Sequence, residues 1–255
     1  MEMERIPAVE VVRRQVNGLA AVSPLSVTQS YSGNASERSP LSLDLTETWA
    51  RVAFRRSNLP RRYWGLRLAD VPEIPHQRLA KRLILKWLDE FDAGNSERRY
   101  PDWSIVLASK QPGTGKTHLA RALVAEVCRR GRVAALITEP ALMDELREAQ
   151  RPESDFGLVE VRKHYIKAPL LVIDDLGKAR ITEFVAETLF QVLNARDERQ
   201  RPVLVTTNME PDQIAERYGP LYGPYIVSRL IGMCRGARTW VRMDGPDLRS
   251  APART

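Results

Sequence analysis

The 255-residue sequence has only two cysteines, Cys128 and Cys234, and three histidines. Two cysteines cannot build a disulfide framework or a four-cysteine zinc site, and the histidines lack the spacing of metal ligands. The first ten residues contain no apolar segment of the kind found in secretory signals, and no apolar run approaches the roughly 18 residues of a membrane span. These absences predict a cytoplasmic protein that has no membrane partner.

Lysine is also scarce, although the chain is basic. Lysine and arginine together number 39 against 32 acidic residues, and only seven of the 39 are lysine. Arginine makes planar, bidentate contacts with phosphate, so the excess fits a polyanionic partner. A genome-wide codon bias explains the same excess equally well.

The N-terminal part differs in composition from the rest. Seven serines fall between Ser23 and Ser42, and such a segment buries too little apolar surface to offset its ordering entropy. We expect an N-terminal arm over 1–56 that is flexible over 1–44 and helical near 45–57. One folded domain should cover 57–255.

This domain alternates apolar strands with helices. The expected strands are 104–108, 133–137, 170–173, 203–206 and 238–243. The expected helices are 76–93, 116–130, 140–149, 157–167, 182–199, 211–218 and 225–234. Short apolar strands separated by helices predict an α/β fold with a five-stranded, mostly parallel sheet covered on both faces.

The strongest motif joins the first strand to its helix through the run Gly113-Thr114-Gly115-Lys116-Thr117. Glycines let backbone N–H groups approach a phosphate, and the helix N-terminus adds a favourable dipole. Lys116 should reach the β- and γ-phosphates, and the Thr117 hydroxyl should bind Mg²⁺. The full pattern asks for a glycine at position 110, where this chain has Lys110, so the entry turn of the loop stays open.

A second motif, LLVIDDLG, places two aspartates at the end of a buried strand. Ligands of open parallel sheets bind at the carboxyl ends of the strands. Asp174 suits the Mg²⁺ shell through Thr117 and water, and Asp175 could orient or deprotonate the attacking water. Either aspartate alone could instead cap a helix.

Three further polar residues are candidates for the same site. Asn208 ends the fourth strand and could hold the attacking water, or could cap the next helix. Arg229 is the single cation on an apolar helix and could serve a neighbouring subunit's nucleotide, or form a salt bridge within the domain. Arg249 could touch the γ-phosphate, or be a solvated arginine near the C-terminus.

Two basic clusters are ambiguous. One could line a nucleic-acid path or be a solvated helix face; it comprises Lys163, His164, Tyr165, Lys167, Lys178 and Arg180. The other could grip a partner, DNA or the adenine ring; it comprises Trp49, Arg51, Arg55, Arg56, Arg61, Arg62, Tyr63 and Trp64.

Six segments occur in an order that resembles the AAA+ ATPases of the bacterial helicase-loader family, the DnaC/DnaI type, and the related IstB-type transposition helpers. They are SNLPRRYWGLRLADV, QPGTGKTHLA, ITEPALMDELREA, LLVIDDLG, ETLFQVLNARDERQRPVLVTTNM and IVSRL followed by GPDLR. The resemblance covers roughly 57–249. It implies a P-loop AAA+ domain; with only twelve residues after the fifth strand, we expect no C-terminal helical lid.

The resemblance also implies residue roles. Lys116 and Thr117 would be the Walker A residues, Asp174 and Asp175 the Walker B pair, Asn208 sensor 1, Arg229 the arginine finger, and Arg249 a sensor-2-like arginine. ATP would bind in the loop that includes Gly113, Thr114, Gly115 and His118, with Mg²⁺ on Thr117 and Asp174. The segment Leu59–Tyr63 would lie near the adenine.

The function implied first is an ATP-hydrolysing loader that self-associates through its ATP sites, engages single-stranded DNA and delivers a hexameric replicative helicase. The alternative is a transposition helper that binds duplex DNA and positions a transposase. A small-molecule P-loop kinase is a third reading, which Asn208 together with Arg229 disfavours.

Overall fold

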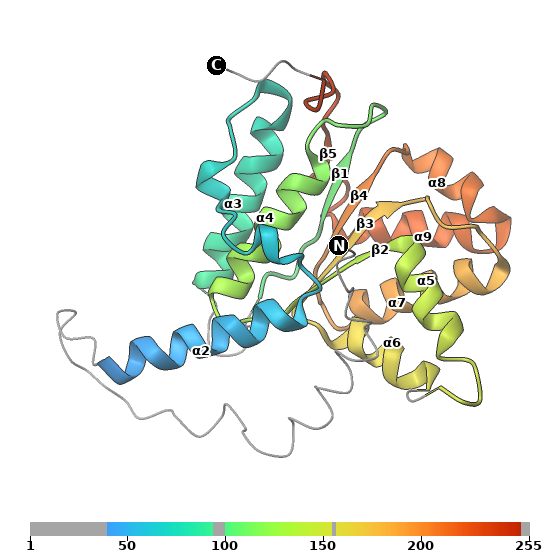
Figure 1. Ribbon diagram of the computed structural model, residues 1–255. Coiled ribbons are helices and arrows are strands. Elements are labelled where there is room, and N and C mark those ends of the chain that lie inside the picture. The colour runs from blue at the N-terminus through green and yellow to red at the C-terminus, as the bar shows by residue number, and fades with distance from the viewer. Residues whose placement is uncertain (1–39, 94–99, 155–156, 251–255) are drawn as a thin grey trace.

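The computed structural model describes residues 40–93, 100–154 and 157–250, with no side-chain description for 40–46. Five strands form one sheet in the order β2-β3-β4-β1-β5, and every neighbouring pair is parallel (Figure 1). The strands are β1 Ile105–Ala108, β2 Ala134–Thr138, β3 Leu170–Leu176, β4 Val203–Thr207 and β5 Trp240–Arg242. The predicted α/β fold with a five-stranded parallel sheet is confirmed.

Helices connect and cover the strands. The α-helices are α2 Pro40–Arg56, α3 Arg78–Asp92, α4 Lys116–Arg129, α5 Glu139–Glu148, α6 Leu158–Lys167, α7 Glu183–Glu198, α8 Pro211–Arg217 and α9 Gly219–Met233. Three short 3-10 helices precede α3: η2 Arg61–Tyr63, η3 Leu68–Asp70 and η4 Pro75–Gln77. None of the helices in the described ranges is long and apolar enough to cross a membrane.

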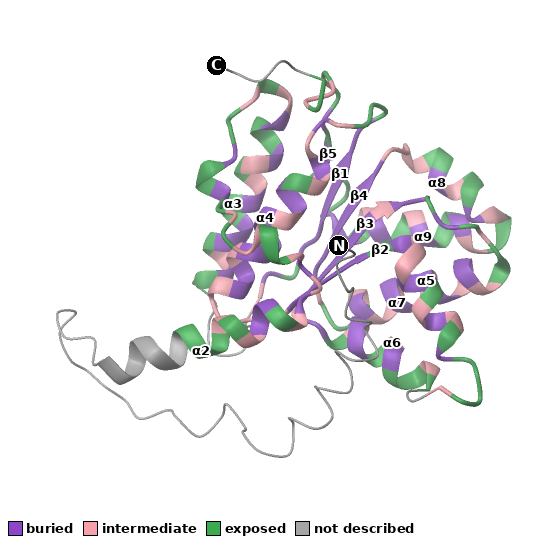
Figure 2. Ribbon diagram, in the orientation of Figure 1, coloured by how far each residue is buried: buried purple, intermediate pink, exposed green. Residues whose placement is uncertain are grey.

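The sheet separates two apolar cores. Helices α2, α3 and α4 pack on one face, and α5 to α9 pack on the other (Figure 1). Because successive strand residues point to opposite faces, Ile105 and Leu107 of β1 join the first core while Val106 joins the second. Figure 2 shows the strands almost wholly buried between helices whose outer faces are exposed. The sheet can therefore hold polar groups in place only where its strands end. We call the side with the carboxyl ends of the strands the carboxyl edge, and the side with their amino ends the amino edge.

Helix α9 begins earlier than the sequence suggested. The expected helix over 225–234 starts at Gly219 and contains Pro220 and Pro224. Pro220 lies in the first turn, where a missing N–H costs nothing, and Pro224 removes only one intrahelical bond near the start. A Cβ on Gly223 would lie 1.9 Å from the Ala215 carbonyl oxygen, so this glycine lets α8 and α9 approach each other closely.

The N-terminal segment enters the domain through α2. This helix begins at Pro40, five residues before the expected 45, and proline suits the first position of a helix. Ala53 and Phe54 at its C-terminal end are buried in the first core. Residues 1–39, most of the arm predicted to be flexible, lie outside the described residues, and the domain boundary at residue 57 stays a prediction.

Candidate phosphate-binding site

The loop between β1 and α4 depends on two glycines. Gly113 has φ +74° and Gly115 has φ +93°, a region that only glycine adopts at no steric cost. A Cβ on Gly113 would lie 1.8 Å from Asp247 Oδ1, and one on Gly115 would lie 2.1 Å from Gln77 Nε2. Both the backbone conformation and the close approach of other segments therefore require glycine here.

This loop has donors that no acceptor satisfies. Within the described ranges, the N–H groups of Gly113, Thr114 and Gly115 donate to no backbone acceptor, and the buried Thr114 hydroxyl has no partner. Lys116, only 6% exposed, donates from Nζ to the Gln111 carbonyl at 3.2 Å. Free amides at a helix N-terminus beside a buried lysine fit a phosphate group.

Charge and burial act against each other at Lys116. Burial lowers the pKa of its ammonium group, and the nearby Asp175 and Asp174 carboxylates raise it. The Lys116 ammonium group thus interacts electrostatically with the two aspartates that the sequence placed in the same site. An anion bound in the loop would add to the negative charge around this ammonium group.

Lys110 stands where the full motif has its first glycine. Its φ is not among the positive values of the described residues, and its side chain is exposed to solvent. Its N–H donates to Asp244 Oδ1 at 3.1 Å. The entry turn therefore has a conformation that does not need glycine.

Asp174 is held by two hydroxyl groups. Thr117 Oγ1 donates to Asp174 Oδ1 at 2.9 Å, and Thr206 Oγ1 donates to the same oxygen at 2.6 Å. The aspartate is 2% exposed. A hydroxyl of the phosphate loop and a carboxylate of β3 in direct contact form a donor set that Mg²⁺ prefers, so the residues present fit the predicted Mg²⁺ site.

Asp175 has a strained backbone and a perturbed carboxylate. Its φ is +59°, although it is not glycine, and its N–H donates to Thr206 Oγ1 at 2.9 Å. Burial raises the pKa of its carboxyl group, and the neighbouring Asp174 raises it further. A strained residue with a raised pKa in such a site suits a proton acceptor.

Asn208 and His118 lie at the same edge of the sheet. Asn208 directly follows β4, whose last residue Thr207 pairs with Ala108 of β1 and with Leu176 of β3. It therefore lies between the strand that leads to the loop and the strand that carries the aspartates. His118 is the third residue of α4 and is exposed.

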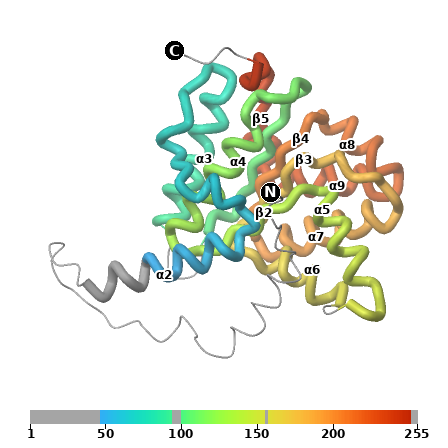
Figure 3. The backbone as a smooth tube through the Cα atoms, viewed as in Figure 1, coloured from blue at the N-terminus to red at the C-terminus, as the bar shows by residue number. Residues whose placement is uncertain are grey.

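The segment after β5 returns to the loop, as the red end of the tube in Figure 3 shows. The Leu248 N–H donates to the Gly113 carbonyl at 3.0 Å. Arg249 is beside the loop but faces Asp247, donating from Nη2 to Oδ2 at 2.9 Å and from Nε to Oδ1 at 3.1 Å. The structure thus brings Arg249 near the site and pairs it with a carboxylate.

Arg229 lies at the opposite edge of the sheet. Its helix α9 ends beside the start of β1, where the Ser104 N–H donates to the Met233 carbonyl at 2.9 Å. Arg229 pairs with Asp197 of α7 at 3.1 Å, and its side chain stays 44% exposed. The salt bridge within the domain is present, and Arg229 is not brought to the phosphate loop of its own chain.

The basic run around α6 is divided by burial. Lys163, Lys167 and Lys178 are exposed, whereas His164 and Tyr165 are buried in the protein. The three lysines and the exposed Arg180 are available to a polyanion, and the aromatic ring that could have stacked on a base is in the second core.

Several residues at the site were not predicted from the sequence. Thr206 holds both aspartates, Gln77 donates to the Thr114 carbonyl at 2.7 Å, and Arg121 lies 4.0 Å from Asp174 Oδ2. The TTN strand end could have suggested Thr206. Gln77 and Arg121 come from helices with no motif at these positions.

Comparison with known proteins shows what this chain is similar to. Residues 102–224 match the family described as IstB-like ATP binding protein. The chain is 27% identical over 72% of its length to an ATP-binding protein of an insertion sequence from Mycobacterium tuberculosis, and 27% identical over 65% to the replicative helicase loader DnaC of Escherichia coli. These alignments span 67% and 61% of the two relatives.

The fold is similar to that of solved structures. The crystal structure of the DnaC helicase loader superposes with a TM-score of 0.57 at 23% identity, covering 72% of this chain and 99% of that one. The resemblance inferred from the motifs, to both the DnaC/DnaI and the IstB types, is confirmed.

Proposed function

Since residues 102–224 match the family described as IstB-like ATP binding protein and the fold is that of P-loop AAA+ ATPases, we propose that the chain binds ATP with Mg²⁺ and hydrolyses it to ADP and phosphate. One observation carries the proposal. The Thr117 hydroxyl contacts Asp174 at 2.9 Å, directly behind a loop with free amides and the buried Lys116. Strands β1 and β3 and helix α4 thus supply the phosphate-binding and metal-binding groups together.

Each residue has a proposed role. The amides of 113–115 and the Lys116 ammonium bind the phosphates, and Thr117 and Asp174 hold the metal. Asp175 accepts a proton from the attacking water, for which its raised pKa is suited, and Asn208 orients that water. Bound Mg²⁺ neutralises charge on the phosphates. His118 and Arg249 are proposed contacts of the nucleotide.

Two lysines of one loop test the ATPase proposal. We expect Lys116→Ala to reduce ATP hydrolysis by about a hundredfold or more, because it removes the buried cation of the phosphate site. Lys110→Ala, which changes an exposed lysine in the same loop, should leave the rate within about twofold. Equal rates for the wild type and Lys116→Ala would refute the proposal.

For the finer function, we propose a helper ATPase that positions a transposase on DNA. The family match and the similarity to the Mycobacterium tuberculosis protein support the helper ATPase. The second candidate is the loader of a hexameric helicase onto single-stranded DNA, which the similarity to DnaC supports. In both, self-association would bring Arg229 of one subunit to the ATP of the next.

A paired capture experiment separates the candidates. Immobilised full-length protein is offered the host's replicative helicase or the transposase of an IstB-type insertion sequence from the same host, with ATP and with ADP, and Lys116→Ala serves as the control. Retention of the transposase alone, dependent on ATP and lost in the control, supports the helper. ATP-dependent retention of the helicase alone would replace it with the loader.

A further inference from the structure

Arg121 joins the phosphate site to a segment that precedes the sheet. It lies on α4 one turn after Thr117, so both side chains are on the same face of the helix. Its guanidinium donates from Nη1 to the Tyr63 hydroxyl at 2.8 Å, lies 4.6 Å from the Tyr63 ring centroid, and approaches Asp174 Oδ2 to 4.0 Å. No motif or proposed step uses this arginine.

The residue after Tyr63 packs against helix α2. This residue, Trp64, stacks on Phe54 of α2 with ring centroids 5.2 Å apart, and its Nε1 donates to the Leu59 carbonyl at 2.8 Å. These contacts fix η2, which ends at Tyr63. The hydroxyl that accepts from Arg121 is therefore in a defined position.

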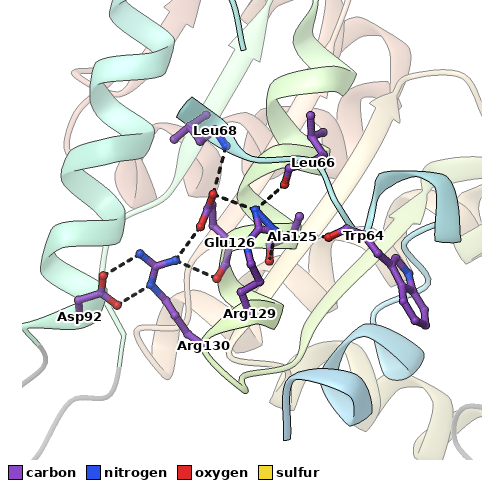
Figure 4. Close-up of polar contacts among 8 residues, drawn as sticks. All are labelled: Trp64, Leu66, Leu68, Asp92, Ala125, Glu126, Arg129 and Arg130. Carbon is purple, nitrogen blue, oxygen red and sulfur yellow. Dashed lines mark hydrogen bonds and ion pairs between the residues drawn. The ribbon is translucent and has the colours of Figure 1, made fainter. Parts of the chain in front are cut away.

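The chain after Tyr63 is fixed to α4 itself (Figure 4). Glu126 accepts from the Leu68 N–H at 3.1 Å, and Arg129 donates to the Leu66 and Trp64 carbonyls. Arg130 binds Glu126 and Asp92 of α3, which completes the cluster. Tyr63 and Arg121 thus belong to elements that cannot separate without breaking several hydrogen bonds.

The two distances of the Arg121 guanidinium indicate its role. It forms a full hydrogen bond with the neutral Tyr63 hydroxyl but remains at the outer limit of an ion pair with the buried Asp174. A guanidinium and a carboxylate in a site of low dielectric attract each other strongly. Tyr63 therefore restrains a cation that would otherwise move toward the carboxylate proposed to hold Mg²⁺.

We infer that the Arg121 guanidinium competes with Mg²⁺ for Asp174 and that Tyr63 is a positioning residue, which limits this competition by holding the guanidinium at 4.0 Å from Asp174. This inference rests on the proposed function, because it assumes that Mg²⁺ and a nucleotide bind here. The effect of Tyr63 passes through Arg121 alone. Removing the tyrosine hydroxyl and removing the arginine must then change Mg²⁺ binding in opposite directions.

The test measures binding rather than turnover. A fluorescent ATP analogue is bound to the full-length protein while Mg²⁺ is titrated, and the Mg²⁺ concentration at half-maximal binding is recorded. Arg121→Gln removes the competing charge, so this concentration should fall about threefold. Tyr63→Phe keeps the ring and frees the guanidinium to approach Asp174, so the concentration should rise about threefold.

The double variant and one control make the test specific. Arg121→Gln combined with Tyr63→Phe should match Arg121→Gln alone, because the tyrosine has nothing left to restrain. Arg62→Gln is the control, since Arg62 also lies over the Tyr63 ring, at 5.0 Å, but is exposed and has no ion pair with Asp174. It should leave the Mg²⁺ requirement unchanged.

The outcomes separate the inference from the proposed function. If the wild type binds the analogue with Mg²⁺ but the two single variants shift the requirement in the same direction, or additively in the double variant, the inference is wrong and the proposed function stands. If the wild type shows no Mg²⁺-dependent binding, both fall. Equal weakening of binding with and without Mg²⁺ would indicate a purely structural contact and also overturn the inference.

Discussion

The two edges of the sheet arrange their charged groups differently. At the carboxyl edge, amides of the phosphate loop lack backbone acceptors and the cation Lys116 is buried beside Asp174 and Asp175. At the amino edge, arginines are already paired: Arg229 with Asp197 at 3.1 Å and Arg235 with Asp102 at 3.4 Å. The first edge carries the groups proposed to bind an anion and a cation, and the charges of the second are paired within the protein itself.

The difference between the two edges separates groups that serve binding from groups that serve stability. The Thr114 hydroxyl is buried without a partner, which costs free energy that a bound ligand would recover. Paired charges near the surface need no ligand and contribute little. Substitutions at the carboxyl edge should therefore change catalysis, whereas buried contacts at the amino edge should change folding.

The largest effect is expected at Asp174. Asp174→Asn removes the charge proposed to hold Mg²⁺, while Thr117 and Thr206 can still donate to the remaining carbonyl oxygen. Hydrolysis should fall by about a hundredfold or more, with the unfolding free energy changed by about 1 kcal/mol or less. Steady-state phosphate release and denaturant unfolding measure the two quantities. A variant that keeps a quarter of the wild-type rate would contradict the contrast between the edges.

The next effect is on folding at the amino edge. Arg196 is fully buried and donates to the carbonyls of Tyr165, Ile166, Ala168 and Pro202. Arg196→Met leaves these carbonyls without their donor and should lower the unfolding free energy by about 3 kcal/mol. Arg199→Met, at the exposed end of the same helix, should cost less than about 0.5 kcal/mol in the same urea titration. Similar losses in both variants would show that burial does not decide the effect.

Features that depend on residues close together in the sequence could be predicted, and contacts between distant residues could not. The phosphate loop was predictable because its glycines, Lys116 and Thr117 are consecutive and the loop conformation is local. The five-stranded parallel sheet followed from the alternation of apolar strands and helices, whereas its strand order was not predicted. The contacts of Arg121 with Tyr63 and of Thr206 with Asp174 were not predictable, because the partners lie 58 and 32 residues apart in the sequence.

Two features contradicted local rules. An arginine in an amphipathic helix normally indicates an exposed face, yet Arg196 is buried because the last carbonyls of α6 and the turn before β4 converge on it. Prolines normally interrupt a helix, yet α9 begins before Pro220 and Pro224 because both lie near its start. Tertiary contacts override the preference at Arg196, whereas position within the helix explains the prolines of α9.

A smaller effect concerns pH at the amino edge. Burial, with the positive charge of Arg56 nearby, lowers the pKa of His164 to about 4. Folding therefore favours the neutral ring, and its contribution is complete above the ordinary pKa near 6.5 and is lost as the pH falls toward 4. Between pH 7.5 and 5 the wild type should lose about 2 kcal/mol more unfolding free energy than His164→Leu. Parallel pH profiles of the two proteins in urea would contradict this.

The smallest effect on stability is expected at the pair that holds Arg229. Asp197→Asn removes the partner of an arginine that is 44% exposed, so the unfolding free energy should fall by less than about 0.5 kcal/mol. If Arg229 serves the ATP of a neighbouring subunit, releasing it should raise hydrolysis about twofold at protein concentrations where subunits associate, and not in dilute protein. Arg229→Ala is the matched control and should abolish the concentration-dependent part of the rate. A loss of activity in Asp197→Asn as large as in Arg229→Ala would show instead that the salt bridge itself is required, and the amino edge would then no longer be merely neutralised.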